Sequence, residues 1–562
     1  MVDIIADDYY NLGTFGRRIT TNSIEAQIWF NRGITWVYGF NHYEAFKCFE
    51  KATEYDPSCA IAYWGIAYSK GPNYNKNWEL FDEEDLKQTV QDTFKASRTA
   101  QVLASNSTPI ERALINSIQV RYQGDYKIER QNYATNNKEY ADRMQLVYEK
   151  YSEDLDVATL YADALMNLTP WKLWDLFTGK PTPDSRTLDV KDVLEKALKQ
   201  NGADEHPGLL HMYIHFIEMS PNPELGIDVA NKLRNLIPDS GHLKHMPSHL
   251  DILVGDYKAS MISNYNATLA DDKYLAREGA HNFYSFYRLH NYHSLIYAAM
   301  FSGMKSIAID SVNRMEKAIP DDLLKVQSPP MADWLESFMA VRLHVMVRFG
   351  MWNEIIDIAL PNDKVVYCVT TATTHYAKGV AWAATGNIQK AEHERDLFES
   401  TRQQIPTSRL AFPNKCVDIM AVGAAMLNGE IEYRRGNCDN AFKILRKSNE
   451  LEDNLVYSEP WGWMQPTRHA YAALLLEQGH VEEATEVYGA ELGFNNTLIR
   501  ARQHPNNVWA LKGYHECLVR LGRRSEAAHV EHKLLLGLNI ADIPIKSSCF
   551  CRLDTDQTFR LG

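Results

Sequence analysis

Histidines are concentrated in one short part of this chain. Nine of the nineteen histidines lie between His206 and His293. Two segments there are near-copies, His211-Met-Tyr-Ile-His215 and His245-Met-Pro-Ser-His249, and their equivalent histidines are 34 residues apart. Residues four apart share one face of a helix, so each H-M-x-x-H segment is predicted to present a pair of imidazoles. Two such pairs on neighbouring helices would form a metal site, with these four histidines as its core ligands.

Three further side chains could complete this site. Glu218 follows His215 by three residues and is expected on the same helix face. His290 and His293 lie in a third segment, where His293 is predicted to take the repeat position of His211 and His245. Three roles are open to Glu218: it could be a metal ligand, a catalytic general base, or a partner that fixes an imidazole tautomer.

The ligand types indicate which metals would bind. Imidazoles and a carboxylate without cysteine suit copper, iron, nickel or zinc, and argue against a zinc site of the finger type. Met212 stands where zinc proteases with H-E-x-x-H carry their glutamate, so that motif is absent. Six histidines and a carboxylate exceed the needs of one ion, so the sequence allows a dinuclear centre. We expect copper or iron rather than zinc.

A simpler interpretation competes with the metal site. A histidine on an apolar helix is more often a hydrogen-bonded core residue than a ligand, and repeat duplication copies residues without copying function. Against this, no other repeat of the chain carries H-x-x-x-H. The sequence does not decide whether five other histidines join the site. We interpret His206 and His242 as possible helix caps, and His42, His375 and His469 as structural.

Turn signals divide the chain into paired helices. Glycines recur at the expected turns, several of them as G-x-x-x-x-A, at Gly255, Gly303, Gly350, Gly386, Gly436, Gly479 and Gly522. The first repeat shows aromatic and small residues at characteristic spacings, at Trp29, Gly33, Trp36, Ala45, Phe49, Ala52 and Pro57. No strand alternation and no low-complexity tract is found, so an all-α fold is predicted.

These residues resemble the tetratricopeptide repeat family, whose period is 34 residues. The resemblance implies a right-handed α-solenoid of about nine or ten helix pairs, in which the first helix of each pair lines a concave groove. More narrowly, the chain is similar to a group of bacterial and fungal proteins with F-N-H-x-E-A (from Phe40), Y-I-H-x-x-E (from Tyr213), G-H-L-x-H-M-P-x-H (from Gly241), H-N-x-H (from His290) and H-P-N-N-x-W (from His504). That group is described only as repeat-containing, so the resemblance implies a fold and no reaction.

The predicted organisation follows the repeats. We expect an N-terminal leader at 1–24, tetratricopeptide-like repeats at 25–200 with an aromatic insertion at 169–190, and the histidine-rich repeats at 201–320. Further repeats are expected at 321–540, and an extended tail at 541–562.

Composition excludes some classes of function. A net charge of −13 disfavours nucleic-acid binding and anionic membrane surfaces, because both need clustered Lys and Arg. The eight cysteines are scattered, which is typical of free thiols in a reducing compartment. No signal peptide or membrane span is recognised, so a cytoplasmic protein is expected.

The leading hypothesis is a metal-dependent enzyme with its site in the groove of the repeats. Oxidation of a small molecule by a copper- or iron-dependent oxidase or oxygenase is weakly favoured. A zinc-type hydrolase with Glu218 as base is an alternative. The other alternative is a non-enzymatic scaffold that binds a peptide partner. Each of these hypotheses is compatible with a homo-oligomer or with a protein partner on the repeat surface.

Overall fold

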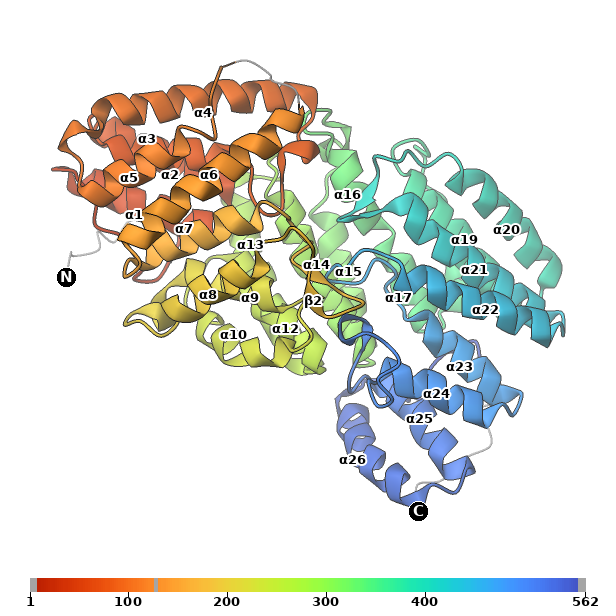
Figure 1. Ribbon diagram of the computed structural model, residues 1–562. Coiled ribbons are helices and arrows are strands. Elements are labelled where there is room, and N and C mark those ends of the chain that lie inside the picture. Colours follow the sequence, from red (N-terminus) through yellow and green to blue (C-terminus); the bar gives the residue numbers. More distant parts are fainter. Residues whose placement is uncertain (1–7, 126–129, 554–562) are drawn as a thin grey trace. The chain divides into compact units, whose positions relative to one another are not determined.

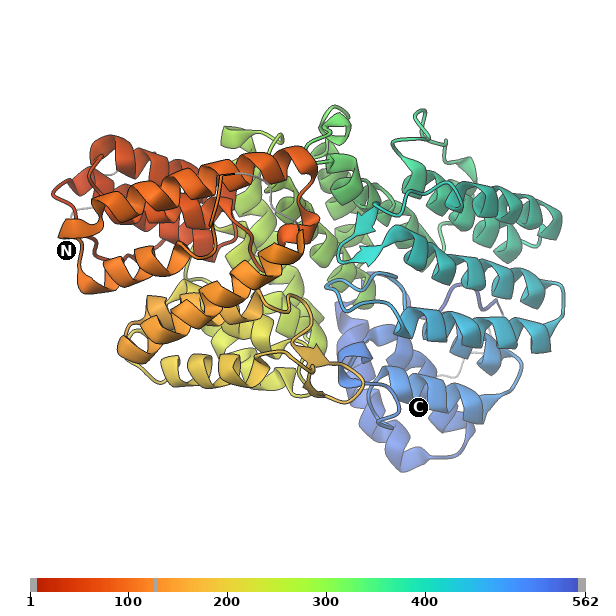
Figure 2. The ribbon, with the colours of Figure 1, turned by 45° about the horizontal axis from the view of Figure 1, so that its top comes forward.

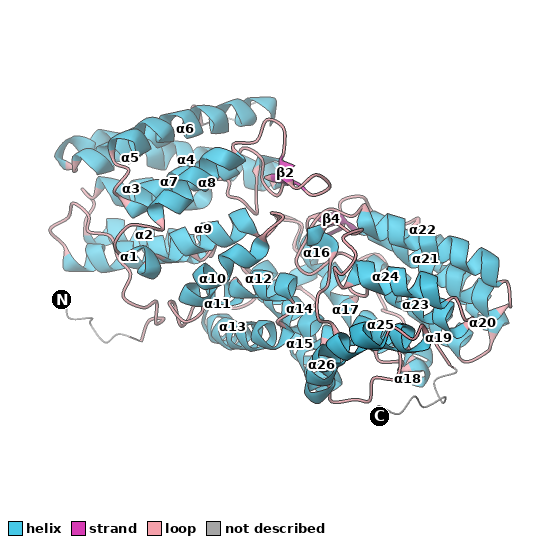
Figure 3. Cartoon of the chain, turned by 60° about the horizontal axis from the view of Figure 1, so that its bottom comes forward, coloured by secondary structure: helices cyan, strands magenta, loops and turns pink. Residues whose placement is uncertain are grey.

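A computed structural model describes residues 8–125 and 130–553 of the chain (Figure 1). The chain divides into two compact units. The first comprises residues 1–250 and 265–288, and the second comprises residues 251–264 and 289–562. Helices make up nearly all of the regular structure in both units (Figure 3). The prediction of an all-α fold is therefore confirmed.

The first unit contains a run of helices that follow one another in close succession. Its helices and its two short strands are α1 (Ile24–Tyr38), α2 (His42–Tyr55), α3 (Ala60–Lys70), α4 (Glu83–Leu103), α5 (Pro109–Ile118), α6 (Arg130–Lys150), α7 (Leu155–Met166), β1 (Trp174–Asp175), β2 (Lys180–Pro181), α8 (Thr187–Ala197), α9 (Pro207–Ile217), α10 (Ile227–Leu233) and α11 (Gly241–His245).

Three helices contain the points at which the chain passes between units. They are α12 (Pro247–Val254), α13 (Tyr257–Glu278) and α14 (Ser285–Phe301). The second unit continues with α15 (Lys305–Lys317), α16 (Met331–Met339), α17 (Val341–Arg348), α18 (Trp352–Asp357), α19 (Cys368–Ala384), α20 (Ile388–Arg402), β3 (Leu410–Ala411), β4 (Asn414–Lys415), α21 (Cys416–Arg434), α22 (Cys438–Asp453), α23 (Thr467–Glu477), α24 (Val481–Glu491), α25 (Val508–Arg520) and α26 (Arg524–Ile540).

The predicted glycine turns join these helices into pairs. All seven glycines have positive φ angles, from +61° at Gly350 to +85° at Gly386. A left-handed residue after the last helical turn is the usual way to end a helix, and only glycine adopts it without steric cost. Helices α19 to α22, joined in pairs at Gly386 and Gly436, lie side by side within the second unit (Figures 1 and 2). The helix-pair prediction is thus confirmed at each of these turns.

Phe49 shows why small residues recur in the first repeat. Its side chain is fully buried between α1, α2 and α3. A Cβ atom placed on Gly33 or on Gly65 would lie 2.6 Å from a carbon of the Phe49 ring. The two glycines therefore leave the space that the ring occupies, and the helices approach closely around it.

The predicted insertion at 169–190 forms a short hairpin between α7 and α8. Strands β1 and β2 pair antiparallel, with Trp174 opposite Pro181 and Asp175 opposite Lys180. The hairpin is anchored where the Trp174 indole N–H donates to the carbonyl oxygen of Phe216 at 2.7 Å. This segment therefore packs against α9, the helix that carries the first histidine pair.

The described parts of the predicted leader and tail contain buried residues. Tyr10, in the leader, is buried, and Ser548, in the tail, is fully buried. Cys549 and Cys551 form a disulfide with Cα atoms 5.1 Å apart, so the expectation of free thiols throughout is wrong at this pair; two residues of separation place the sulfurs within bonding reach. Positions 1–7 of the predicted leader and 554–562 of the predicted tail lie outside the described residues. Among the described residues, no helix has the length and apolarity needed to span a membrane.

Candidate metal centre

The first histidine pair lies on α9, a short apolar helix. Pro207 occupies its first turn, and His206 caps it: the His206 Nδ1 atom accepts a hydrogen bond from the Leu209 N–H at 3.0 Å. His211 and His215 follow at the spacing of one turn, and at most 1% of either residue is exposed. The prediction that His206 is a helix cap is confirmed.

The second pair is arranged differently from the first. Pro247 begins α12, and α11 ends two residues earlier at His245, so His245 and His249 lie on two consecutive short helices. Proline lacks the N–H that would continue the hydrogen-bond ladder, and its ring excludes the preceding turn. The expectation of one helix with both histidines on one face is therefore wrong, although both residues remain fully or almost fully buried.

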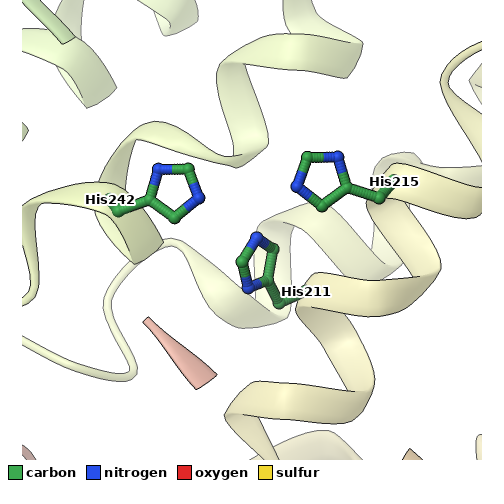
Figure 4. A group of neighbouring side chains, drawn as sticks. All are labelled: His211, His215 and His242. Carbon is green, nitrogen blue, oxygen red and sulfur yellow. The ribbon is translucent and has the colours of Figure 1, made fainter. Parts of the chain in front are cut away.

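The two segments meet in a group of buried polar side chains, which we name the histidine cluster: His211, His215, His242, His245, His249 and Glu218. Three of its rings bring nitrogen atoms close together. One nitrogen each of His211, His215 and His242 lies within 4.8 Å of the other two. Figure 4 shows the rings of His211 and His215, both on α9, pointing toward the ring of His242 on α11. The sequence analysis treated His242 as a possible helix cap, but Ser240 occupies the N-cap position of α11.

Hydrogen bonds set the tautomers of the two α9 rings. The Nδ1 atom of His211 lies 2.6 Å from the carbonyl oxygen of Tyr38, and the Nδ1 atom of His215 lies 2.8 Å from Glu218 Oε1. Both partners are acceptors, so each Nδ1 carries the proton and each Nε2 keeps a lone pair. The two Nε2 atoms are buried without a hydrogen-bond partner among the described residues.

Burial also keeps these rings uncharged. Desolvation, followed by repulsion from His215, lowers the pKa of His211 well below its usual value. Desolvation, followed by repulsion from His249, does the same to the pKa of His215. A neutral imidazole with a free Nε2 lone pair is the form that binds a transition metal.

Glu218 connects the two histidine segments. Its carboxylate is completely buried, and its Oε2 atom accepts a second hydrogen bond from His249 Nδ1 at 2.5 Å. Because each carboxylate oxygen already accepts an N–H, the arrangement favours the third of the roles open to Glu218, that of fixing imidazole tautomers. A second imidazole, that of His249, is thereby oriented with its Nε2 atom away from the carboxylate.

His245 and His249 lie too close together for an ion between them. Their Nε2 atoms are 2.8 Å apart, which is a hydrogen-bond distance. Two nitrogens bound to one ion at 2.0–2.1 Å would be roughly 3.4 Å apart in a tetrahedral site. The nitrogens of His211, His215 and His242 lie within 4.8 Å of one another, so a closing movement of at most about 1.4 Å would reach that spacing. These three rings therefore fit an ion better than the His245–His249 pair.

Phe40 covers one side of the cluster. Its ring is 4.4 Å from the ring of His211 and is stacked on His215 and His242 at 5.7 and 5.4 Å between centroids. Phe40 has φ +54° and occupies the turn between α1 and α2. In the equivalent turn between α19 and α20 the left-handed residue is Gly386. In both turns the left-handed residue and the residue after it each donate a backbone hydrogen bond to the end of the preceding helix.

A second aromatic residue with a positive φ lies against the same cluster. Trp171 has φ +60°, and its ring centroid is 5.9 Å from that of His215. Among the described residues, the other non-glycine positions with positive φ are aspartate and asparagine, which tolerate this conformation. A strained backbone that holds a bulky ring is typical of functional sites, where the surrounding structure offsets the strain. Tyr74 completes this wall at 5.2 Å from His215.

The other histidines considered in the sequence are divided between the two units. His290 and His293 belong to the second unit, where the His293 ring packs edge-on against Phe338 at 5.5 Å. His375 bonds Glu394 at 2.7 Å within that unit. His42 was expected far from the site, but its ring stacks on Phe40 at 5.8 Å in the first unit. The sequence left open whether His242 joins the site, and it did not predict Phe40 there; the signal for Phe40 was its presence where the other turns carry glycine.

No protein-family model matches the chain, and no curated protein matches it. Solved structures do show similarity. The chain is similar to the APC/C heterotetramer Cut9-Hcn1 (10% identity over 92% of this chain and 94% of that chain, TM-score 0.27) and to yeast Tom70 (12% identity, 91% and 92%, TM-score 0.28). It is also similar to the P58(IPK) TPR domain (12% identity, 76% and 99%, TM-score 0.17). TM-scores this low do not establish a shared fold, so the tetratricopeptide-type architecture rests on the helix pairs themselves.

Proposed function

We propose that the first unit binds a transition-metal ion through the Nε2 atoms of His211 and His215 together with a ring nitrogen of His242. The observation that carries this proposal is the state of the two α9 rings. Each donates its Nδ1 proton to an oxygen and keeps a buried Nε2 atom without a partner among the described residues. An unpaired buried polar atom costs about 1–3 kcal/mol, which metal coordination would offset.

Three imidazoles and no thiolate suit copper, iron or zinc, and leave a coordination position for a small molecule. Within this proposal, oxidation by a copper- or iron-dependent enzyme is the reaction we favour. Hydrolysis at zinc needs a general base, and the best candidate, Glu218, uses both oxygens to accept hydrogen bonds from His215 and His249. A second ion stays a prediction, because the nitrogens and oxygens around Glu218 are at hydrogen-bond spacing.

A peptide-binding scaffold is the second candidate. The helix-pair architecture by itself supports it, because arrays of this type present extended faces to partner chains. A scaffold gives no reason for unpaired, neutral imidazoles inside the first unit. A scaffold also requires no catalytic residues, whereas an enzyme must provide them.

Metal analysis distinguishes the two candidates. The full chain, purified without an affinity tag and incubated in turn with Cu²⁺, Fe²⁺ and Zn²⁺ before dialysis, should retain about one ion per chain of at least one metal, as one three-imidazole site predicts. Elemental analysis gives the stoichiometry, and electron paramagnetic resonance and absorption spectra identify a copper or iron centre. A chain that retains none of the three ions contradicts the metal proposal and leaves the scaffold.

A further inference from the structure

A cavity of about 260 Å³ lies beside the histidine cluster in the first unit. Its lining runs from the exposed Tyr43 and Gln88 to the buried Asn41 and Ser69, so it leads from the surface into the interior. It is too small for a peptide chain, and lies just below the size range of sites for drug-sized ligands.

The cavity and the cluster share a wall. Phe40 lines the cavity, stacks on the cluster rings of His215 and His242, and contacts the ring of His211. Tyr287 also lines the cavity, and its ring centroid is 5.0 Å from that of His242. A molecule in the cavity would therefore lie one aromatic ring away from the proposed metal ligands.

Seven of the residues that line this cavity are aromatic. They come from the turn before α2 and from α2 itself, from the segment before α4, and from the residues just before α14 and its first turn, and they are Phe40, Tyr43, Phe46, Phe81, Phe283, Tyr284 and Tyr287. Aromatic rings prefer offset-stacked or edge-to-face contacts with other rings. A planar aromatic ligand is therefore favoured over an aliphatic one of the same size.

The charged residues in the lining cancel one another. Lys70 pairs with Asp92 at 2.5 Å, and Lys76 pairs with Asp85. The Lys76 ammonium is also held over the rings of Phe81 and Phe283, at 4.2 and 4.9 Å from their centroids. A charged ligand would have to break these pairs or leave its own charge uncompensated. The lining therefore favours a ligand without net charge.

His42 supplies the polar contact in this lining. Both of its ring nitrogens are buried without a hydrogen-bond partner among the described residues. Burial, with smaller contributions from Lys76 and Arg121, lowers the pKa of His42 to about 4. The neutral ring offers one donor and one acceptor, which is the pattern that a single hydroxyl group can satisfy.

We propose that this cavity binds a small, uncharged aromatic molecule that carries a hydroxyl group, with the hydroxyl at His42 and the ring between the aromatic side chains. The proposal deepens the proposed function by naming the class of substrate for the metal centre. Only this assignment of a substrate rests on the proposed function. Binding itself requires no metal.

Fluorine NMR of the metal-free full chain tests the proposal with three probes of similar size: 4-fluorophenol, 4-fluorotoluene and 4-fluorobenzoate. The phenol should bind about tenfold more tightly than the toluene, the effect of one or two hydrogen bonds to otherwise unpaired atoms. The benzoate should show no saturable binding. In H42L the preference for the phenol over the toluene should be lost, whereas H42Q, which keeps a donor and an acceptor, should retain part of it.

The matched control is H529L, which removes an exposed histidine from α26 and should leave all three titrations unchanged. Equal affinity of the wild type for the phenol and the toluene, or no saturable binding of either, overturns the proposal, and neither result depends on how the variants fold. Because the titration uses metal-free protein, its outcome is separate from that of metal analysis. Phenol binding by a chain that retains no metal would support the cavity and contradict the metal centre.

Discussion

Each unit buries a carboxylate between two histidines, and the two groups differ in what the rings do next. In the first unit Glu218 lies between His215 and His249, at 2.8 and 2.5 Å. In the second unit Glu491 lies between His504 and His469, at 2.8 and 3.5 Å. All six residues are buried. Residue types and burial are thus the same in both groups.

The second nitrogen of each ring makes the difference. In the second unit the Tyr297 hydroxyl lies 2.9 Å from His504 Nε2, and an Arg348 N–H lies 2.9 Å from His469 Nδ1. Each of these two rings therefore has a polar atom within 3.5 Å of both of its nitrogens. In the first unit the Nε2 atom of His215 has none among the described residues. The comparison teaches that a histidine–carboxylate pair indicates a metal site only when the far nitrogen is left available.

The largest expected effect is loss of metal from the first group alone. The double variant H211A/H215A removes two of the three proposed ligands, and should reduce bound metal from about one ion per chain to near zero. The matched variant H469A/H504A should keep the wild-type stoichiometry. Elemental analysis after reconstitution measures both, with circular dichroism to check helix content. Equal loss of metal from both variants would show that the two groups do not differ as the geometry indicates.

The second group should instead contribute stability. Glu491 is charged, because His504 and His469 hold its pKa far below the usual range against the effect of burial. Replacing it in E491L leaves the buried rings of His504 and His469 without the carboxylate that they share, and should cost about 1–3 kcal/mol of unfolding free energy. Urea unfolding of the full chain measures this, with E482Q on the exposed face of α24 as control. Unchanged stability in E491L would mean that this network is not structural.

A smaller effect is expected from Glu218, because it orients ligands without being one. E218Q would keep the shape of the side chain but weaken its hold on the Nδ1 protons of His215 and His249. Loss of such a partner typically reduces metal affinity by about 10- to 100-fold. Competition with a chromophoric chelator measures the affinity, and E224Q, at an exposed position, is the matched control. Complete loss of binding in E218Q would instead make Glu218 a direct ligand.

The smallest expected effect concerns His344, a buried histidine that is not paired with a carboxylate among the described residues. Burial lowers the pKa of His344 to about 4. The unfolded chain takes up a proton at this residue near its ordinary pKa of about 6.5, whereas the folded chain does not until about pH 4. Stability is therefore complete above about pH 6.5 and falls as the pH decreases toward 4.

Between pH 7.5 and pH 5 this single residue should contribute a loss of about 2 kcal/mol in unfolding free energy. Urea unfolding at the two pH values measures the loss. H344F should show a correspondingly smaller dependence on pH, although the other buried histidines keep part of it. An identical pH dependence in H344F and in the wild type would contradict the assignment.

Local patterns were sufficient to predict the helices and their turns. Gly386, Gly436, Gly479 and Gly522 all have left-handed backbones, and a Cβ atom on any of them would meet nothing within 4 Å. Their requirement for glycine is a property of the turn alone, so it is visible in sequence. The spacing of His211 and His215 likewise predicted a shared helix face, because four residues make about one turn.

Sequence by itself thus determined the all-α class, the paired helices and the concentration of imidazoles in the first unit. Tertiary structure alone decided which imidazole nitrogens could bind a metal ion. His242 joins the cluster, Pro247 splits the second pair, and Phe40 covers the rings at a turn position where glycine is usual. Each of these depends on atoms far apart in the chain, such as the Tyr38 oxygen that holds His211 Nδ1. A ring's second hydrogen bond is set by packing, and no local spacing encodes it.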